Sequence, residues 1–510
     1  MSEHRVVIVG AGMGGLCSAI ALAYQGLHVT VVEAGNAPGG KVHSREIHGA
    51  QIDSGPTVFT MRWVFDALLR SVGTSVESEM RITPLQVLAR HFWPDGSQLD
   101  LSADAHQSEA AIAAWSSGDE ARRFREFCKT TRQLYATLEG PMICAQRPNM
   151  GGFMGDLGFK GLGVLAQLGP MRSLWQQLGQ QFTDPRLRQL FARYATYCGS
   201  SPWQSPATLM LIAQVEMDGV WSVDGGMVGM AQALARVARR HGAVFRYQST
   251  CQRIEQRQGK VSGVHLQSGE FLPADRVIFD GDAGALRQGL LGDGVRRAVP
   301  SDAPPRSLSA LTWSMYTATE GVMLDRHNVF FQSTYASEFE DIFERQRLPQ
   351  SPTVYVCAQD RPAQLAPGLA ERIFCLVNAP ACGDGKGITE EALEQCQTHT
   401  FQHLQQLGLS LKPTPSNSLR TTPEDFHRRF PASGGALYGQ ATHGWTSIFS
   451  RPGSTTPLQG LYLAGGSVHP GPGVPMAALS GQRAAEAVMA SLASTKTFQT
   501  GATFGGMSTP

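Results

Sequence analysis

Three glycines near the start of the chain have the spacing of a loop that binds a dinucleotide. Gly10, Gly12 and Gly15 form the pattern GxGxxG, and Gly14 adds a fourth glycine to the loop. In such a loop the first glycine allows a tight turn, the second lets the backbone approach a pyrophosphate, and the third lets a helix pack closely on a strand. Glu33 follows at the spacing of a ribose-binding acid. These residues predict a dinucleotide site.

The elements around this loop are those that would position it. Val6–Val9 is a β-branched run typical of a buried parallel strand. Leu16–Gln25 is rich in Ala and Leu and predicts a helix that ends before Gly26, and residues 28–32 predict a second strand. The helix N-terminus would offer free N–H groups and the positive end of its dipole to a phosphate. The acid at Glu33 disfavours NADP, because it would repel the extra phosphate.

A second glycine-rich turn lies near the other end of the chain. Leu461–Leu463 predicts a strand that runs into Gly465 and Gly466, and a segment rich in Gly and Pro then leads to a helix predicted over Ala477–Leu492. A glycine turn between a strand and a helix is another place where backbone can approach a phosphate closely.

The residue pattern changes twice in the middle of the chain, first to mainly helical and then back to α/β. Ser108–Leu138 predicts one helix, and Leu157–Leu178 is apolar with few charges, which suits either a helix at a membrane interface or an internal core helix. After Trp221 the pattern returns to α/β. The predicted elements there are a helix over 227–240, a strand over 244–247, a hairpin over 251–267 that turns at Gly259, and a buried strand over 277–279 that ends before Asp280.

Composition excludes several classes of protein. The 510 residues allow two to four domains, and a net charge of +1 argues against a nucleic-acid partner. Nine cysteines without a CxxC pair indicate a reducing compartment. His399 and His403 lack further ligands at useful spacing, so no metal is predicted. The sequence shows neither a signal peptide nor an apolar run of the length of a membrane span, so we expect a cytosolic protein or one attached to a membrane from the cytosolic side.

Two further segments make the chain resemble a known family. Gly39-Gly40-Lys41 follows the second predicted strand, and Ile52–Thr57 comes next. With both glycine-rich ends, these segments resemble the flavin amine oxidase superfamily and, within it, the carotenoid desaturases of the phytoene desaturase type. The closest resemblance is to 1-hydroxycarotenoid 3,4-desaturases, also called methoxyneurosporene dehydrogenases. It is carried by Gly435–Gly439, His443–Trp445, Ala464–Gly466 and Pro475–Gly481.

The resemblance implies an α/β (α+β) fold with a discontinuous, Rossmann-like FAD-binding domain. An inserted mixed domain would bind the substrate and include a helical part that faces a membrane. The predicted boundaries are 1–80, 222–290 and 440–492 for the FAD domain, 81–221 and 291–439 for the substrate domain, and 493–510 for a flexible tail.

The resemblance also implies where FAD binds. Lys41 would approach the pyrophosphate, the backbone near Cys251 would approach adenine, and the segment that ends at Thr57 would run beside the flavin. The complete set of implied cofactor residues is Gly10, Gly12, Gly14, Gly15, Glu33, Gly40, Lys41, Gly55, Pro56, Thr57, Cys251, Gly465, Gly466, Val474, Pro475 and Met476.

The activity implied is FAD-dependent desaturation of an acyclic 1-hydroxycarotenoid at C-3,4, by hydride transfer to flavin N5 and loss of a proton. One alternative is a phytoene desaturase acting on carotenes without a hydroxyl group. A remote alternative is a non-catalytic protein that binds prenyl groups, like the Rab GDP-dissociation inhibitors. The reduced flavin would pass its electrons to oxygen or a quinone, and Phe153–Leu174 is one candidate contact with the membrane surface.

The sequence assigns no catalytic base. Arg193, together with Tyr194 and Tyr197, is a candidate in a helical segment that would line the cavity. His469 either lines the substrate cavity or is structural. A tertiary hydroxyl group on the substrate would need one polar partner near the end of its tunnel, and Tyr438 is the hypothesis for that partner.

Overall fold

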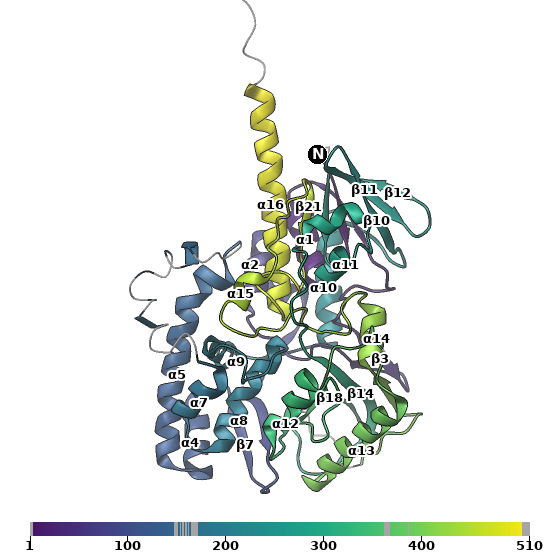
Figure 1. The fold of residues 1–510 in the computed structure, drawn as a ribbon. Helices are drawn as coiled ribbons and strands as arrows, with labels where there is room; N and C mark the ends of the chain where they lie inside the picture. Colours follow the sequence, from purple (N-terminus) through teal and green to yellow (C-terminus); the bar gives the residue numbers. More distant parts are fainter. Residues whose placement is uncertain are drawn as a thin grey trace, which may run out of the picture.

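The first layer of the fold is a five-stranded parallel sheet (Figure 1). The computed structural model describes residues 4–146, 151–153, 155, 158, 161, 163–164, 172–361, 368–385 and 387–501. In spatial order the strands of this sheet are β21 (Leu461–Leu463), β13 (Arg276–Phe279), β1 (Arg5–Val9), β2 (His28–Val32) and β9 (Val244–Arg246). Segments that are distant in sequence thus build one sheet, which makes this part of the fold discontinuous.

Three helices pack around this sheet. α1 (Met13–Tyr24) lies between α10 (Gly226–Arg240) and α16 (Val474–Gly501) and is buried over most of its length. Its core is shared with the strand residues Ile8 and Val31, both fully buried. Because all the strands run parallel, their carboxyl ends meet at one edge, and the loops that follow β1, β13 and β21 come together there.

A seven-stranded mixed sheet forms the second part of the fold. Its order is β20 (Ser418–Thr421), β14 (Ser309–Ala318), β18 (Ala370–Ala379), β17 (Val354–Ala358), β16 (His327–Phe330), β6 (Val87–Phe92) and β7 (Gln98–Ser102). One face packs on α13 (Glu390–Gln406) through Trp313, Cys375 and Leu404. The residues of the opposite face, such as Val329 and Tyr355, belong to the core shared with the helices.

A helical region closes that opposite face and lies at the left of Figure 1. It contains α4 (Ala105–Trp115), α5 (Gly118–Leu138), α7 (Leu174–Gln181), α8 (Pro185–Ala192), the 3-10 helix η2 (Arg193–Cys198) and α9 (Leu211–Met217). The single helix predicted over 108–138 is wrong, since Ser116 and Ser117 separate α4 from α5. Ser117 takes an extended conformation and its side chain accepts a hydrogen bond from Glu120 N, so it caps α5 and stops the helix from continuing.

Smaller elements complete the fold. The remaining strands form a three-stranded sheet and three two-stranded pairs: β10 (Cys251–Arg257), β11 (Lys260–Leu266) and β12 (Phe271–Pro273); β3 (Ser44–Ile47) with β4 (Ala50–Asp53); β5 (Ile82–Pro84) with β8 (Trp221–Val223); β15 (Glu320–Gly321) with β19 (Leu409–Ser410). The short helices are α2 (Trp63–Ser71), α3 (Val76–Glu79), α11 (Ala283–Arg287), α12 (Tyr335–Phe339), α14 (Pro423–Arg429) and α15 (Ser447–Ser450), with η1 (Glu139–Ile143), η3 (Ala207–Met210), η4 (Asp293–Ala298) and η5 (Glu340–Glu344).

Two sequence predictions concern segments that the structure describes only in part, the C-terminal tail and Leu157–Leu178. α16 extends to Gly501, into the tail predicted from residue 493, and the flexibility of that tail stays a prediction. No Gly or Pro interrupts the chain between Gln482 and Thr500, so nothing in this stretch ends the helix. Half of Leu157–Leu178 lies outside the described residues, and α7 begins only at Leu174. In the part of the chain that the structure describes, no helix is long and apolar enough to cross a membrane.

Candidate functional site

The loop between β1 and α1 is a cradle made of backbone. Gly10 has φ +105°, and a side chain there would lie 2.6 Å from Asp280 O. Gly12 is the N-cap of α1 and has no side chain with which to cap the helix, so the N–H groups of the first turn receive no hydrogen bond from the N-cap residue. A side chain at Gly12 or Gly14 would come within 2.7 Å of an Asp280 carboxylate oxygen. The loop therefore exposes N–H groups where a phosphate can bind.

The other predicted cofactor glycines are packed against this loop. Gly39 N donates to Ala11 O at 2.8 Å, and a side chain at Gly40 would lie 3.2 Å from Gly12 Cα. Gly55 is in contact with Lys41 O, which leaves no room there for a side chain. The structure thus brings the turn at 39–40 and the start of the 55–57 segment to the glycine loop.

The C-terminal glycine turn reaches the same place from β21. Gly465 has φ +103°, and a side chain there would lie 2.8 Å from Asp280 Oδ1. Ser18 Oγ donates to Gly481 O at 2.8 Å, and Gly481 lies directly on Gly14 O. α16 begins at Val474 beside this turn. A second helix N-terminus therefore lies at the site, where the sequence predicts that Val474, Pro475 and Met476 meet the flavin.

Glu33 connects the glycine loop to the predicted adenine end. Its Oε2 accepts from Ala11 N and its Oε1 from Gly35 N, both at 2.7 Å. Ser249 N donates to Glu33 O and Gln248 N to Gly35 O, each at 2.8 Å. The segment that leads into β10 at Cys251 is therefore held beside Glu33, and the binding of a ribose and adenine there stays a prediction.

Lys41 has a different set of contacts from the one predicted. Its Nζ donates to Leu437 O at 2.6 Å and lies 5.3 Å from the centre of the Phe430 ring. Burial lowers the pKa of this ammonium group, and the nearby charge of Asp282 opposes that shift. Lys41 thus holds the loop that leads to Tyr438, and its approach to a pyrophosphate stays a prediction.

Sequence reasoning missed Asp280, which follows β13 and lies among the glycines of the cradle. Its Oδ2 is buried and makes no hydrogen bond to any residue that the structure describes. Burial raises its pKa to about 7, and the charge of Glu33 adds to this, while the N–H groups of Gly15 and Gly12 oppose it. The signal was available, since an acid directly after a strand that pairs with β1 must lie beside the loop of β1.

These features fit a dinucleotide with a flavin. Backbone at Gly12, Gly14 and Gly465 leaves space that any side chain would fill, and two helix N-termini offer N–H groups to a pyrophosphate. The orphaned carboxylate of Asp280 marks the cradle as a polar space inside the protein. Within the described residues, no group of His, Cys, Asp and Glu could hold a metal ion.

A polar cluster surrounds Thr57, the last residue of the predicted flavin-side segment. Tyr355 Oη lies 2.7 Å from Thr57 Oγ1 and 2.6 Å from His327 Nδ1. His327 is 3% exposed, and its Nε2 is buried with no hydrogen-bond partner in the described parts of the chain. Burial lowers the His327 pKa to about 3, and the charges of Arg326 and Arg193 lower it further, so the imidazole is neutral near pH 7.

Arg193 is the cation of this cluster. Its guanidinium lies 5.1 Å from the centre of the Tyr197 ring and 5.5 Å from that of Tyr355, and its Nη1 donates to Tyr197 Oη at 3.1 Å. Tyr194 Oη donates to the buried Glu216 at 2.6 Å. No carboxylate of the described residues forms a salt bridge with Arg193. The structure therefore brings Arg193, Tyr197 and Tyr355 together near Thr57, a grouping that the sequence could not show.

The other two weak catalytic candidates have separate surroundings. His469 is 3% exposed, its Nε2 lies 3.1 Å from Ala145 O, and burial lowers its pKa to about 4. It is therefore a neutral donor that joins the C-terminal turn to the chain after α5, which favours the structural alternative. Tyr438 packs on Gly199, its N donates to Ser307 Oγ at 3.0 Å, and burial raises its pKa to about 12.

Comparison with known proteins places these features in a family. The family described as flavin containing amine oxidoreductase matches residues 13–489. A hydroxyneurosporene desaturase from Rubrivivax gelatinosus is 53% identical over 100% of this chain and 98% of its own. A 1-hydroxycarotenoid 3,4-desaturase from Flavobacterium sp. (strain P99-3) is 28% identical over 95% of this chain and 99% of its own. An oxidoreductase from Methanosarcina mazei has a similar fold, with a TM-score of 0.58 at 16% identity, covering 94% of this chain and 100% of its own.

Proposed function

The chain belongs to the family of flavin containing amine oxidoreductases, and on this premise we propose that it introduces the C-3,4 double bond into acyclic 1-hydroxycarotenoids such as 1-hydroxyneurosporene. It is an FAD-dependent carotenoid desaturase. The observation that carries the finer proposal is the 53% identity to a hydroxyneurosporene desaturase along the whole chain. The resemblance of the C-terminal motifs to 1-hydroxycarotenoid 3,4-desaturases points the same way.

The residues of the chain bind and orient rather than react. FAD, when bound, supplies a hydride acceptor. The glycine cradle and the N-terminus of α1 would hold its pyrophosphate, and Glu33 would accept hydrogen bonds from the ribose. Apolar side chains between the seven-stranded sheet and the helices would line the site of the polyene and exclude water. The neutral cluster of Tyr355 and His327 offers hydrogen-bonding groups beside Thr57.

A comparison of several carotenoid substrates tests this proposal. We would express the protein in cells that make phytoene, neurosporene or their 1-hydroxy derivatives, and identify products by chromatography and absorption spectra. We expect conversion of the 1-hydroxy compounds, with a red shift for the added conjugated double bond, and little conversion of the others. Conversion of phytoene would contradict the 3,4-desaturase proposal and favour a phytoene desaturase. A purified protein without flavin would instead favour the prenyl-binding alternative.

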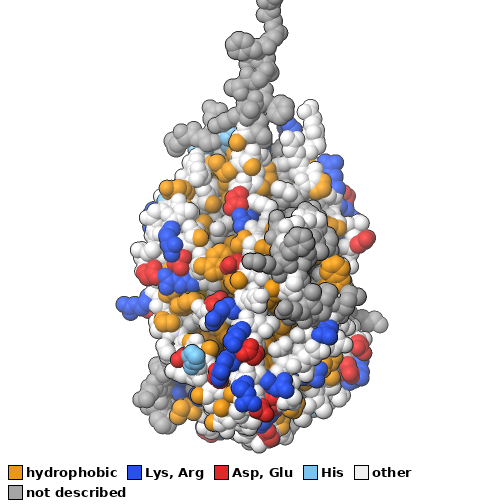
Figure 2. Space-filling model, turned by 90° about the vertical axis from the view of Figure 1, so that its left-hand side faces the viewer, with side chains coloured by type: hydrophobic (Ala, Val, Ile, Leu, Met, Phe, Trp, Pro, Cys, Tyr) orange, Lys and Arg blue, Asp and Glu red, His pale blue; other side chains and the backbone are white. Residues whose placement is uncertain are grey.

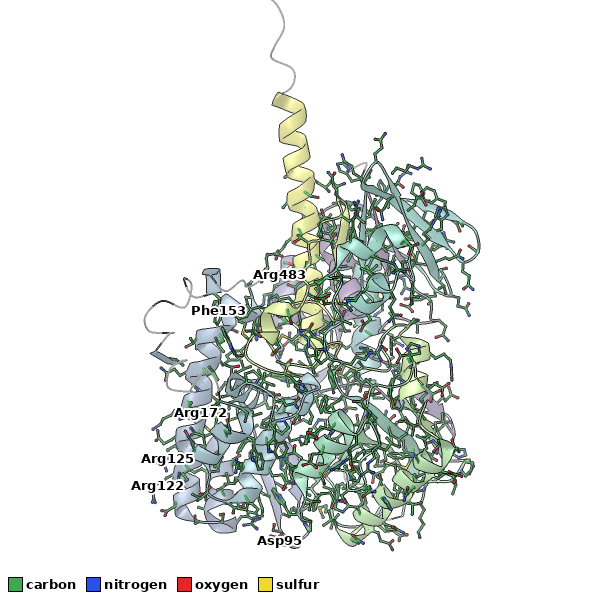
Figure 3. The ribbon with its side chains drawn as sticks, in the orientation of Figure 1. Asp95, Arg122, Arg125, Phe153, Arg172 and Arg483 are labelled. Atoms are coloured by element: carbon green, nitrogen blue, oxygen red, sulfur yellow. The ribbon has the colours of Figure 1, made fainter. Side chains whose placement is uncertain are left out.

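We also propose that the enzyme works at the cytoplasmic face of a membrane, where its apolar substrate resides, and passes electrons to oxygen or a quinone. Phe153, the first residue of the candidate contact, is only 7% exposed and packs on Phe449 of α15, while Trp445 just before α15 is 42% exposed. Figure 2 shows the side of the molecule that lies at the left of Figure 1. Apolar side chains are seen in the middle of this side, and side chains of both charges lie below them. Figure 3 shows that Arg122, Arg125 and Arg172 line the outer side of the helical region below Phe153.

Trp445→Ser should lower binding to liposomes, because this exposed indole would no longer enter the interface. Co-sedimentation of the purified protein with liposomes measures the effect. Leu419→Ser on edge strand β20 is the matched control, since Leu419 is also 42% exposed. Unchanged binding of Trp445→Ser would show that Trp445 is not part of the contact.

A further inference from the structure

The position of the reaction sets the position of the substrate hydroxyl group. This inference rests on the proposed function, in which the hydroxyl is on C1 and the new double bond joins C3 and C4. Three bonds of about 1.5 Å each separate the oxygen from C3, so the two atoms lie within about 4 Å of each other. C3 and C4 must lie against the flavin to lose a hydride. The group that recognises the hydroxyl must therefore lie beside the flavin and not at the far end of the tunnel.

Tyr355 has a free hydrogen-bonding position at the required place. Its Oη contacts Thr57 Oγ1, in the segment that the proposed function places beside the flavin, and His327 Nδ1. A phenolic hydroxyl has one donor and two acceptor positions. Two of these three positions are used by Thr57 and His327, so one is left over for a substrate.

Arg193 has free donors next to that position. A guanidinium carries five N–H donors, and the structure gives Arg193 one hydrogen bond, to Tyr197 Oη. Its guanidinium carbon lies over the rings of Tyr197 and Tyr355. Arg193 is half-buried and forms no salt bridge with the described residues, so its unused donors can serve a ligand that accepts hydrogen bonds. Alkyl and polyene groups cannot accept them, whereas an alcohol oxygen can.

We propose that Arg193 and Tyr355 form the site that recognises the tertiary hydroxyl group of the substrate. Arg193 donates to the oxygen of the hydroxyl, and the hydroxyl hydrogen is donated to Tyr355 Oη. The site thus binds both the oxygen and the hydrogen of the hydroxyl group, and it distinguishes the alcohol from a carotene that lacks this group. Tyr438, the residue singled out from the sequence, is replaced in this role.

Variants of both residues test the proposal. Tyr355→Phe and Arg193→Met should each lower the preference for the 1-hydroxy substrate over its counterpart without the hydroxyl by about 10-fold to 100-fold, because a site built to bind a hydroxyl discriminates through it. The same variants should weaken binding of the 1-hydroxy compound, measured by quenching of tryptophan fluorescence, and Arg193→Lys should restore part of both. Tyr24→Phe and Arg296→Met, on exposed side chains, control for the loss of a hydroxyl or a charge.

A change in the substrate tests the same contacts in the unmodified enzyme. A 1-methoxy analogue keeps the oxygen that accepts from Arg193 but loses the hydrogen that is donated to Tyr355. The wild type should prefer the alcohol to the ether about 10-fold, and Tyr355→Phe should treat the two alike. This comparison remains decisive if the Arg193 variants fail to fold.

Three outcomes would overturn the proposal. They are an unchanged preference in both Tyr355→Phe and Arg193→Met, a loss of preference in Tyr438→Phe alone, and an equal preference of wild type and Tyr355→Phe for alcohol over ether. Failure of the proposed function looks different, because the wild type itself would then not convert the 1-hydroxy substrate.

Discussion

Gly481→Ala should yield a protein that is purified without FAD. Gly481 of α16 lies against Gly14 O in the glycine loop, and Ser18 Oγ donates to both Gly14 O and Gly481 O. An added methyl group would fall on the Gly14 carbonyl, and neither backbone can move without separating α1 from α16. Overpacking of this kind costs about 3 kcal/mol, and here it also displaces the N–H groups that would bind the pyrophosphate.

The flavin absorbance of the purified protein, relative to its protein absorbance, measures this effect. We expect at least a tenfold lower flavin content, with a lower midpoint of thermal unfolding. Gly118→Ala is the control, since a side chain there meets nothing within 4 Å and Gly118 does not have a positive φ. A Gly481→Ala protein that keeps its full flavin content would show that the two helices can move apart without harm to the site.

The predictability of the site depends on how far its residues are apart in sequence. The βαβ unit over residues 5–33 could be predicted because its strand, glycine turn, helix and acid are neighbours with their own periodicity. The break at Ser116–Ser117 could not, since helical spacing continues across it and only the cap at Ser117 ends the pattern. The C-terminal turn could be recognised from Gly465 and Gly466, but its contact with Gly14 spans almost the whole chain.

The residues on the substrate side of the site could not be predicted from local sequence patterns. Thr57, Arg193, His327 and Tyr355 come from four segments, and their contact depends on how the seven-stranded sheet packs on the helices. Arg193 was a candidate together with Tyr194 and Tyr197, because all three stand in one predicted helical segment that would line the cavity. Tyr355 and His327 lie on strands β17 and β16, where an aromatic residue is ordinary. Only the pairing of those strands next to Thr57 gives them a role.

Asp280→Asn should stabilise the protein at pH 8 and leave it almost unchanged at pH 4. The ordinary pKa of an Asp is 3.8, and burial raises that of Asp280 to about 7. Between these values the native protein keeps a proton that the unfolded chain has released. The free energy of unfolding therefore falls as the pH rises from about 4 to about 7, and the loss persists above pH 7.

The size of the effect follows from the shift of about three pKa units. At about 1.4 kcal/mol per unit the full loss is about 4 kcal/mol, and the part of the carboxyl that is open to solvent reduces the expected gain of the variant to about 2–4 kcal/mol. Urea unfolding of the apoprotein at pH 4, 6 and 8 measures it. Asp282→Asn is the matched control in the same loop, since Asn keeps the cap that Asp282 gives to α11.

The same carboxyl should make FAD binding depend on pH. A pyrophosphate at the cradle would add negative charge beside Asp280 and favour its protonated form, so binding above pH 7 would take up a proton. The affinity of the wild-type apoprotein for FAD should therefore fall between pH 7 and pH 9, whereas that of Asp280→Asn should change little. Quenching of FAD fluorescence measures both. Parallel pH dependences in the two proteins would mean that Asp280 does not carry the titrating proton, and that the glycine loop accepts the cofactor with this carboxylate charged.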